Sequence, residues 1–234
     1  MKKTIGIILF LFATVSLHAQ QIIKSDQVAD FHAVSVSGNI NVELIPAAEN
    51  SVDIQLYDSD IKKFKWSVSN GTLSLSLRPT SGAKARADVR VYYKGALQNI
   101  SVVDARVTAM DLISHTLRIS VAGGANFTAD LDAQDLELEV TGNSVALVSG
   151  MAKYATLRAT ERSRVDTRKM DAVSVEAEAA TTAELYVTAN ERLVANAKSG
   201  ATIFYAGSPS IFKDRSTKVS SSIGSSVLNI GYKE

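Results

Sequence analysis

The sequence predicts an all-β protein built as a solenoid with about 19-residue coils. Three observations predict this fold. Six short segments between residues 97 and 207 recur at this period, apolar and polar residues alternate within them, and turn-forming residues divide their halves. A short fixed repeat with aligned apolar positions is typical of a solenoid, in which each coil buries its inner face against its neighbours.

Apolar residues form three aligned columns across the six segments. The first column is Val102, Val121, Val140, Ala159, Ala177 and Ala197. The second, two residues earlier, is Ile100, Ile119, Leu138, Leu157, Val175 and Ala195. The third, beyond the turn, is Val107, Phe127, Val145, Val165, Ala183 and Ile203. Successive residues of a strand point to opposite faces, so all three columns are predicted to line the inside of the solenoid.

The segment before the repeats, residues 21–96, is rich in strand patterns but does not follow the period of the later coils. Its clearest feature is Trp66–Leu77, in which two alternating runs flank Asn70–Gly71. An Asn-Gly pair between alternating runs predicts a tight β-hairpin. We therefore expect an irregular β-rich N-terminal section.

The segment after the repeats, residues 208–234, is predicted to form a C-terminal cap with a terminal strand pair near Ser220–Leu228. A solenoid needs such a cap because its last coil otherwise exposes unpaired backbone groups. We thus predict one domain over residues 20–234, divided into the N-terminal section (21–96), the regular coils (97–207) and the cap (208–234).

Residues 1–19 have the pattern of a secretory signal peptide. Lys2 and Lys3 precede the apolar run from Ile5 to Leu17, and Ala19 lies just before a polar stretch. The apolar run is shorter than the roughly 20 residues of a spanning helix, which favours cleavage after Ala19 over a membrane anchor. We expect an exported protein of the periplasm, the cell surface or the extracellular space, with no transmembrane segment in its mature part.

Charge and composition narrow the classes of partner. The chain carries 25 basic and 24 acidic residues, and it contains no cysteine. Nucleic acid is not expected as a partner, because phosphate binding needs a basic surface. No disulfides can form, so core packing and backbone hydrogen bonds must hold the fold. The mature part has only His32 and His115, too few histidines to suggest a metal site, and no cofactor-binding motif is present.

Several segments resemble a known family of exported proteins from Bacteroidetes. They are Val36–Val42 (VSGNINV), Ile119–Ala125 (ISVAGGA), Leu138–Ser144 (LEVTGNS) and Phe204–Pro209 (FYAGSP). In their order and spacing they resemble the auto-transporter adhesin, head GIN domain family. The resemblance implies a right-handed parallel β-helix over essentially the whole mature chain and brings no catalytic residues. The chain departs from the pattern at the turns near Glu161 and Ala180, which lack glycine.

The densest basic cluster is the candidate ligand-contact patch. Arg162, Arg164 and Arg168 lie within Glu161–Lys169, in one of the coils whose turn lacks glycine. A basic groove would suit an acidic glycan. The competing interpretation is an ordinary surface loop, because Glu161 and Asp166 lie close to the arginines.

Charged residues at one outward position predict a ladder between coils. This row is Ser101, Ser120, Glu139, Arg158, Glu176 and Asn196. Arg158 should therefore lie between Glu139 and Glu176, and the next outward position should place Glu178 beside Lys198. Opposite charges across a strand pair each contribute about 0.2–1 kcal/mol, so this ladder is predicted to fix the register of the coils.

An enzymatic function is the main competing hypothesis, because many polysaccharide lyases and hydrolases are parallel β-helices. The candidate acids are Asp130, Asp132, Asp135, Asp166 and Asp171. Carboxylates on neighbouring coils could reach the separation that glycoside hydrolysis needs. Fold analogy alone is weak support for an activity, however.

These observations favour an exported, non-enzymatic binding or adhesin-like module of the cell envelope, with a glycan or an envelope protein as partner. The alternatives are a polysaccharide-processing enzyme and a structural envelope protein that self-associates. The sequence does not specify the ligand, the oligomeric state or the functional face of the solenoid.

Overall fold

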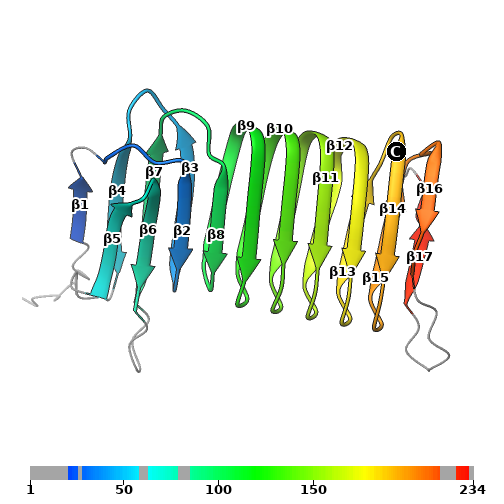
Figure 1. The fold of residues 1–234 in the computed structure, drawn as a ribbon. Coiled ribbons are helices and arrows are strands. Elements are labelled where there is room, and N and C mark those ends of the chain that lie inside the picture. Colours follow the sequence, from blue (N-terminus) through cyan, green and yellow to red (C-terminus); the bar gives the residue numbers. More distant parts are fainter. Residues whose placement is uncertain (1–20, 26–27, 58–62, 79–84, 217–224, 232–234) are drawn as a thin grey trace, which may run out of the picture.

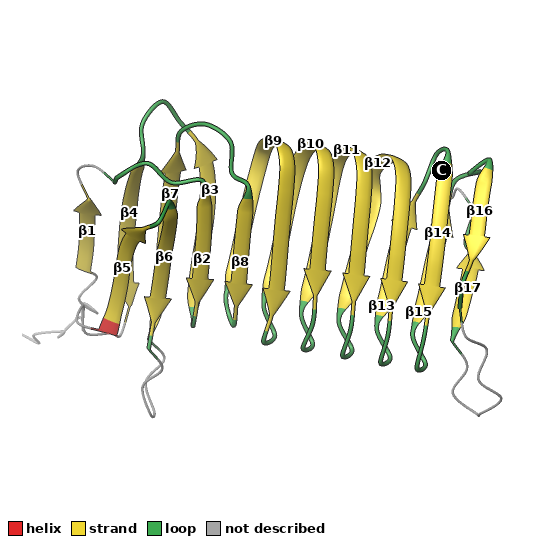
Figure 2. Cartoon of the chain, in the orientation of Figure 1, coloured by secondary structure: helices red, strands yellow, loops and turns green. Residues whose placement is uncertain are grey.

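The chain folds as an elongated β-solenoid with two long faces (Figures 1 and 2). The computed structural model describes residues 21–25, 28–57, 63–78, 85–216 and 225–231, so the predicted signal peptide lies outside the described residues. Within those ranges no helix has the length and apolar character needed to cross a membrane.

Seventeen strands make up the described part of the chain. They are β1 (Gln21–Ser25), β2 (Ala33–Ser37), β3 (Ile40–Pro46), β4 (Ser51–Tyr57), β5 (Phe64–Ser69), β6 (Thr72–Leu77), β7 (Arg86–Tyr93), β8 (Asn99–Val103), β9 (Arg106–Ala122), β10 (Asn126–Val140), β11 (Val145–Ala159), β12 (Arg164–Ala179), β13 (Glu184–Thr188), β14 (Arg192–Ala197), β15 (Thr202–Ala206), β16 (Ile211–Asp214) and β17 (Ser226–Asn229).

The strands pair into two stacked sheets that share the long strands β9–β12. We call the first sheet face 1; it runs β5, β6, β2, β8, the second halves of β9–β12, β14 and β16. Face 2 runs β1, β4, β7, β3, the first halves of β9–β12, β13, β15 and β17. The inward side chains of both faces form one continuous apolar core. This arrangement confirms the predicted parallel solenoid and the length predicted for its coils.

The structure corrects the predicted columns after β11. Ala159 pairs with Ala179 and not with Ala177, and Leu157 pairs with Ala177 and not with Val175. The sequence could not reveal this shift, because a slip of two residues leaves every inward side chain inward. Its cause is a bulge in β12, which adds one residue to this coil. The next coil is correspondingly shorter, so that the observed and predicted positions agree again at Ala197.

Two members of the third column were also placed wrongly. Phe127 pairs with Ala146, not with Val145, and Val165 pairs with Leu185, not with Ala183. Val145 and Ala146 are adjacent apolar residues, so alternation alone did not show which one points inward. In the structure Ala146 is fully buried and Val145 is partly exposed.

Tight turns join face 1 to face 2, and their backbone conformation is the same with and without glycine. Gly142–Asn143, Glu161–Arg162 and Thr181–Thr182 all have positive φ angles at both residues. The backbone N–H of Asn143 donates to the carbonyl of Glu161 (3.1 Å), and that of Arg162 donates to the carbonyl of Thr181 (3.0 Å). The turns that lack glycine therefore continue the hydrogen-bond ladder at the cost of backbone strain.

The N-terminal section is part of the solenoid, but its coils are not stacked in chain order. β2 lies between β6 and β8, and β3 lies between β7 and β9. The first coil of the chain, β2 and β3, therefore lies between the second coil, β6 and β7, and the third, which begins with β8. The predicted hairpin at Asn70–Gly71 is confirmed, since β5 and β6 pair antiparallel around it. This exchange of order explains why the period of the later coils does not extend through residues 21–96.

The C-terminal end is closed by side chains and by two short strands. β16 extends face 1 beside β14, and β17 extends face 2 beside β15, whereas the terminal strand pair was predicted near Ser220–Leu228. Residues 220–224 of that predicted pair lie outside the described residues. The rings of Tyr205 and Phe212 stack with their centroids 5.0 Å apart against the last coil of the core.

Candidate functional site

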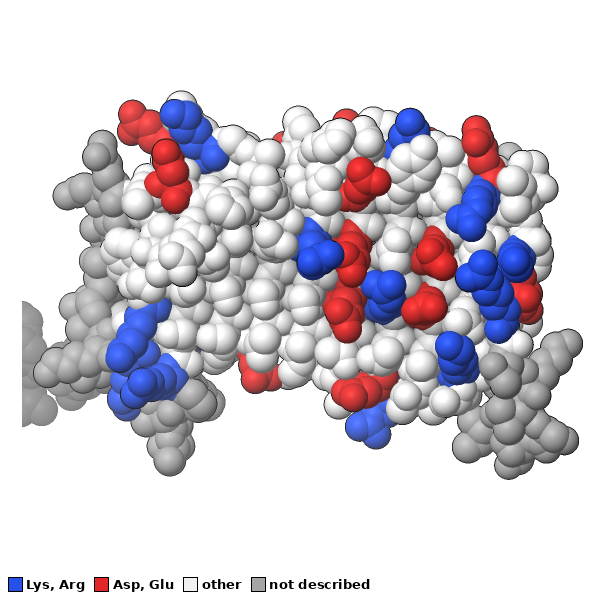
Figure 3. Space-filling view, viewed as in Figure 1, with Lys and Arg blue, Asp and Glu red and all other residues white. Residues whose placement is uncertain are grey.

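The outer side of face 1 carries a ladder of ion pairs across neighbouring coils. Arg118 lies 2.7 Å from Glu137, and Arg158 lies 3.0 Å from Glu137 and 3.3 Å from Glu178. In Figure 3, which shows this face, positive and negative side chains alternate over the C-terminal coils, whereas the part over β2, β6 and β8 is uncharged. A ladder of charges between coils is therefore present, and Glu139 lies opposite Arg158 as predicted.

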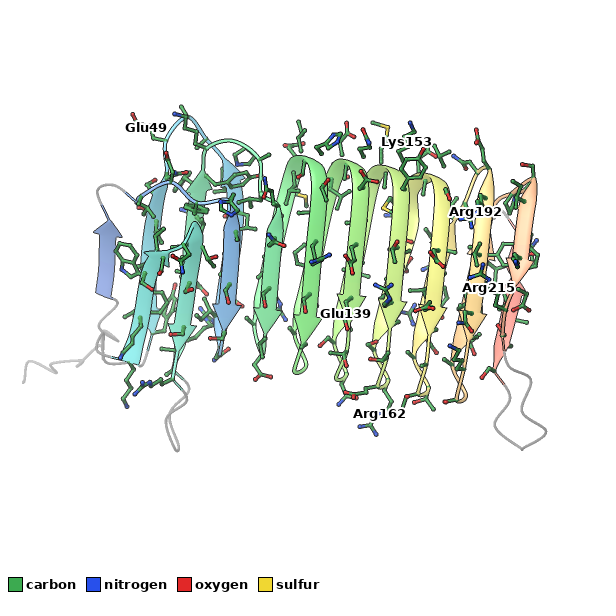
Figure 4. All side chains as sticks on the ribbon, viewed as in Figure 1. Glu49, Glu139, Lys153, Arg162, Arg192 and Arg215 are labelled. Carbon is green, nitrogen blue, oxygen red and sulfur yellow. The ribbon has the colours of Figure 1, made fainter. Side chains whose placement is uncertain are left out.

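Its partners differ from those expected. Arg158 pairs with Glu178 where Glu176 was predicted, and Glu178 lies opposite Asn196 where Lys198 was predicted. Both errors follow from the two-residue shift at β12. Glu176 instead lies 3.8 Å from Arg215, which reaches back from the C-terminal end (Figure 4).

The three predicted contact residues separate into a turn position and a pair on face 2. Arg162 lies on the Glu161–Arg162 turn at the lower edge of the solenoid in Figure 4, where its Nε donates to Asn143 Oδ1 at 3.0 Å. Arg164 and Arg168 lie on β12, on the outer side of face 2. The structure thus brings Arg164 and Arg168 together and leaves Arg162 at the edge.

A β-bulge in β12 positions Arg168. The register of β11 against β12 shifts between Leu147 and Ser149, so β12 carries one extra residue and both Arg168 and Lys169 point outward. Two buried hydroxyls hold this irregular backbone: Thr167 Oγ1 donates to the Tyr186 carbonyl, and Thr188 Oγ1 donates to the Arg168 carbonyl, each at 3.0 Å. Bulges of this kind commonly redirect a side chain.

The bulge directs Arg168 onto an aromatic ladder that sequence reasoning missed. Tyr186 and Phe204 stack with centroids 4.5 Å apart, and the guanidinium groups of Arg164 and Arg168 lie 4.5 and 4.9 Å from the Tyr186 ring. Tyr186 and Phe204 belong to different coils, and only the pairing of β13 with β15 joins them. The predicted third column aligned Ala183 with Ile203, which places Tyr186 and Phe204 out of register, so the predicted alignment did not bring the two rings together.

Carboxylates neutralise both arginines. Arg164 lies 3.2 Å from Glu184, and Arg168 lies 2.5 Å from Asp166. Partial burial raises the pKa of Asp166, but hydrogen bonds and charge from Arg168 outweigh this effect and hold the pKa below its usual range. Asp166 is therefore ionised, whereas a catalytic acid needs a raised pKa. The site is a balanced cluster and not a strongly basic groove.

The other carboxyl groups weighed for catalysis lie in different surroundings. Asp130 accepts a hydrogen bond from Ser149 Oγ at 2.7 Å on face 2, and Asp171 pairs with the amide of Asn190 near the bend that leads to face 1. Asp132 lies at the bend opposite Met151, and Asp135 lies on face 1 opposite Tyr154. Across the ranges that the structure describes, no three His, Asp or Glu side chains gather closely enough to hold a metal ion.

Two shallow grooves cross the faces. One, of about 550 Å³, lies on face 2 over β4, β7, β3 and β9 and is lined by Asn41, Glu43, Arg90 and Arg106 among others. The other, of about 510 Å³, lies on face 1 over β8–β11 and is lined by Arg118, Asp135, Glu137 and Tyr154 among others. Neither groove contains a residue of the predicted arginine patch.

Comparison with solved structures shows the same fold. A putative adhesin from Bacteroides fragilis aligns with a TM-score of 0.76 and 19% identity over 91% of this chain and 97% of its own. A putative adhesin from Parabacteroides distasonis aligns with a TM-score of 0.62 and 14% identity over 91% and 97%. A putative lipid binding protein from the same species aligns with a TM-score of 0.56 and 13% identity over 91% and 95%. No curated protein matches this chain.

The sequence also matches a family as a whole. The model of the putative auto-transporter adhesin, head GIN domain family matches residues 30–209, which include the coils from β2 to β15 and both faces described above. The match covers well over half of the chain and agrees with the resemblance that the repeat motifs carry. The chain therefore belongs to the putative auto-transporter adhesin, head GIN domain family.

Proposed function

We propose that the protein is an exported, non-enzymatic binding module of the cell envelope, with an adhesin-like role. One observation supports this most directly: on the outer faces, arginines form ion pairs with carboxylates of the same or neighbouring coils. Such groups suit contact with a partner better than proton transfer. Membership of a family of putative adhesins supports the same proposal.

The proposed contact surface is the patch around Arg162, Arg164 and Arg168, extended by Tyr186 and Phe204. The guanidinium groups of Arg164 and Arg168 lie over the Tyr186 ring, and arginine and tyrosine are both enriched where proteins meet partners. Arg162 reaches from the turn edge, where it donates to the neutral amide of Asn143. The proposed partner is a glycan or a protein of the envelope.

The experiment is a glycan array with the purified exported protein, run beside a reducing-sugar release assay on the same polysaccharides. We expect binding without release. The variant Arg162→Ala/Arg164→Ala/Arg168→Ala should lose binding, and Arg106→Ala, which removes one arginine from a distant groove, is the matched control. Release of sugar would contradict the proposal and direct attention to Asp130, Asp132 and Asp166.

Export has its own test. We propose that the signal peptide is cleaved after Ala19, so the N-terminal sequence of the exported protein should begin at Gln20. If neither glycan nor envelope protein binds and sedimentation shows concentration-dependent assembly, the structural, self-associating function replaces the binding module. A lipid ligand, suggested by the putative lipid binding protein among the structural neighbours, is a further arm of the array.

A further inference from the structure

The groove on face 1 lies where the long strands β9, β10 and β11 bend from face 2 into face 1. Its floor spans β9, β10 and β11 just after their bends, and the segment ahead of β8, with Ala96 and Gln98, forms one wall. The three floor strands lie about 4.8 Å apart. A ligand that lies across these strands, along the axis of the solenoid, therefore meets equivalent side chains at regular intervals.

Two rows of side chains line the groove in register. Thr116, Asp135 and Tyr154 lie opposite one another on β9, β10 and β11, and two residues further along the strands lie Arg118, Glu137 and Thr156. Hydroxyl, carboxylate and guanidinium groups thus alternate within reach of one bound chain. The carboxylate and guanidinium groups are planar, and each can accept or donate two hydrogen bonds at once.

The charges of the groove compensate each other. Arg118 lies 2.7 Å from one oxygen of Glu137, and Arg158 lies 3.0 Å from the other. Asp135 is a further negative charge, with a 3.4 Å contact from the Gln134 amide. The local field therefore does not favour a polyanion, and the remaining hydrogen-bonding capacity suits a ligand that is polar but uncharged.

Tyr154 adds an apolar surface to these polar groups. Its side chain is 45% exposed at the end of the groove, and the Lys153 ammonium lies 5.3 Å from the ring centroid. An accessible aromatic ring beside convergent polar groups is the usual composition of a small-molecule site. The groove of similar size on face 2 has no aromatic side chain among its lining residues.

We infer that the face 1 groove binds a neutral oligosaccharide, laid along the solenoid axis, with Tyr154 against a sugar ring and Asp135 and Glu137 holding its hydroxyl groups. This inference goes beyond the proposed function, because it adds a second site apart from the arginine patch and assigns that site a ligand class. A sugar presents both an apolar C–H surface and paired hydroxyl groups, which matches the aromatic ring and the planar polar rows.

The test is isothermal titration calorimetry with cellohexaose, mannohexaose, maltohexaose and chitohexaose, and with polygalacturonate as the acidic comparison. We expect at least one neutral hexasaccharide to bind, and Tyr154→Ala to weaken its affinity about tenfold or more. Asp135→Asn, which keeps the planar shape but replaces one acceptor oxygen with an NH2 donor, should weaken it as well. Arg106→Ala should leave it unchanged. Tyr154 and Asp135 lie on the surface, so circular dichroism should show folded variants.

Either of two results overturns the inference: none of the four neutral hexasaccharides binds, or one binds with unchanged affinity to Tyr154→Ala. Binding of polygalacturonate alone, lost in the triple arginine variant, would overturn the neutral-sugar groove and leave the proposed binding function standing. Absence of binding to every sugar and to the other ligands of the array would contradict both.

Discussion

Backbone strain at single residues is concentrated in the turns. Thr181 and Thr182 have φ angles of 54° and 60°, although both are β-branched. The left-handed conformation costs such residues about 1–2 kcal/mol each. We therefore expect Thr182→Gly to increase the free energy of unfolding by about 1 kcal/mol, after allowance for the greater freedom of glycine in the unfolded chain. Thermal denaturation should show a melting temperature about 2–4 °C higher.

Gly124→Thr is the reciprocal control, because it occupies the equivalent turn position. A Cβ atom added at Gly124, where φ is 88°, would meet no atom within 4 Å, so only backbone strain should act. This variant should melt at a lower temperature by a similar amount. A lower melting temperature for Thr182→Gly would show that the threonine turn is not strained.

The ion pair of Asp166 with Arg168 predicts a pH dependence. Because the pKa of Asp166 is lowered in the folded state, the pair stabilises the fold above the unfolded pKa of about 3.9. That contribution is lost as the pH falls through the folded pKa. Asp166→Asn should reduce the free energy of unfolding by about 1 kcal/mol at pH 7, and denaturant titrations should show this difference vanish as the pH falls below 4. An unchanged difference at pH 3 would contradict the assignment.

The residue scale also marks the limit of prediction for the candidate site. The arginines of the patch could be identified because they form a dense run in the sequence. Tyr186 and Phe204 could not, because each is a single aromatic residue in its own coil, and only the exact register of β13 and β15 stacks them. A ring stack between coils depends on pairing that no local pattern encodes.

At the scale of the elements, the charge ladder joins β10, β11 and β12. Arg158 bridges Glu137 and Glu178, and its side chain is 41% exposed. Arg158→Glu should lower the free energy of unfolding by about 1–2 kcal/mol, since it removes two weak pairs and places like charges opposite each other. Arg158→Met, which keeps the packing of the chain stem, should cost less. High salt should narrow the difference between Arg158→Glu and wild type, and equal melting temperatures at low salt would contradict the ladder.

The same strands show what alternation can and cannot predict. Inward residues such as Leu138 and Leu157 were identified correctly because period-two patterning depends only on which face is buried. Glu139 lies opposite Arg158 as predicted, although the ion pair forms with Glu137. The partner of Arg158 on β12 was predicted two residues away from its true position, because a bulge changes the spacing of coils without changing that pattern. Alternation thus predicts which side chains point inward more reliably than it predicts which residues pair between strands.

For the whole molecule, the period predicted the solenoid but not the order of its first coils. Each coil after the one that contains β8 stacks on the coil before it in the chain, so a linear period was visible. β2 and β3 instead stack directly against β8 and β9, with β6 and β7 on their other side. This order of the coils depends on pairing between strands that are far apart in the sequence. The predicted N-terminal irregularity reflects the path of the chain, since the pairing there continues the same two sheets.

A solenoid is nearly one-dimensional, so damage at one end should stay there. Phe212 stacks on Tyr205 and covers the last coil, although its own side chain is 46% exposed. Phe212→Ala should lower hydrogen-exchange protection in β14–β17 while leaving β9–β11 almost unchanged, because each coil contacts only the coils next to it. Phe127→Ala is the matched control: this ring is 1% exposed in a central coil, and its loss should cost about 3–5 kcal/mol and reduce protection on both sides. If Phe212→Ala lowered protection equally along all the described strands, the molecule would unfold as one cooperative unit and its ends would not be independent caps.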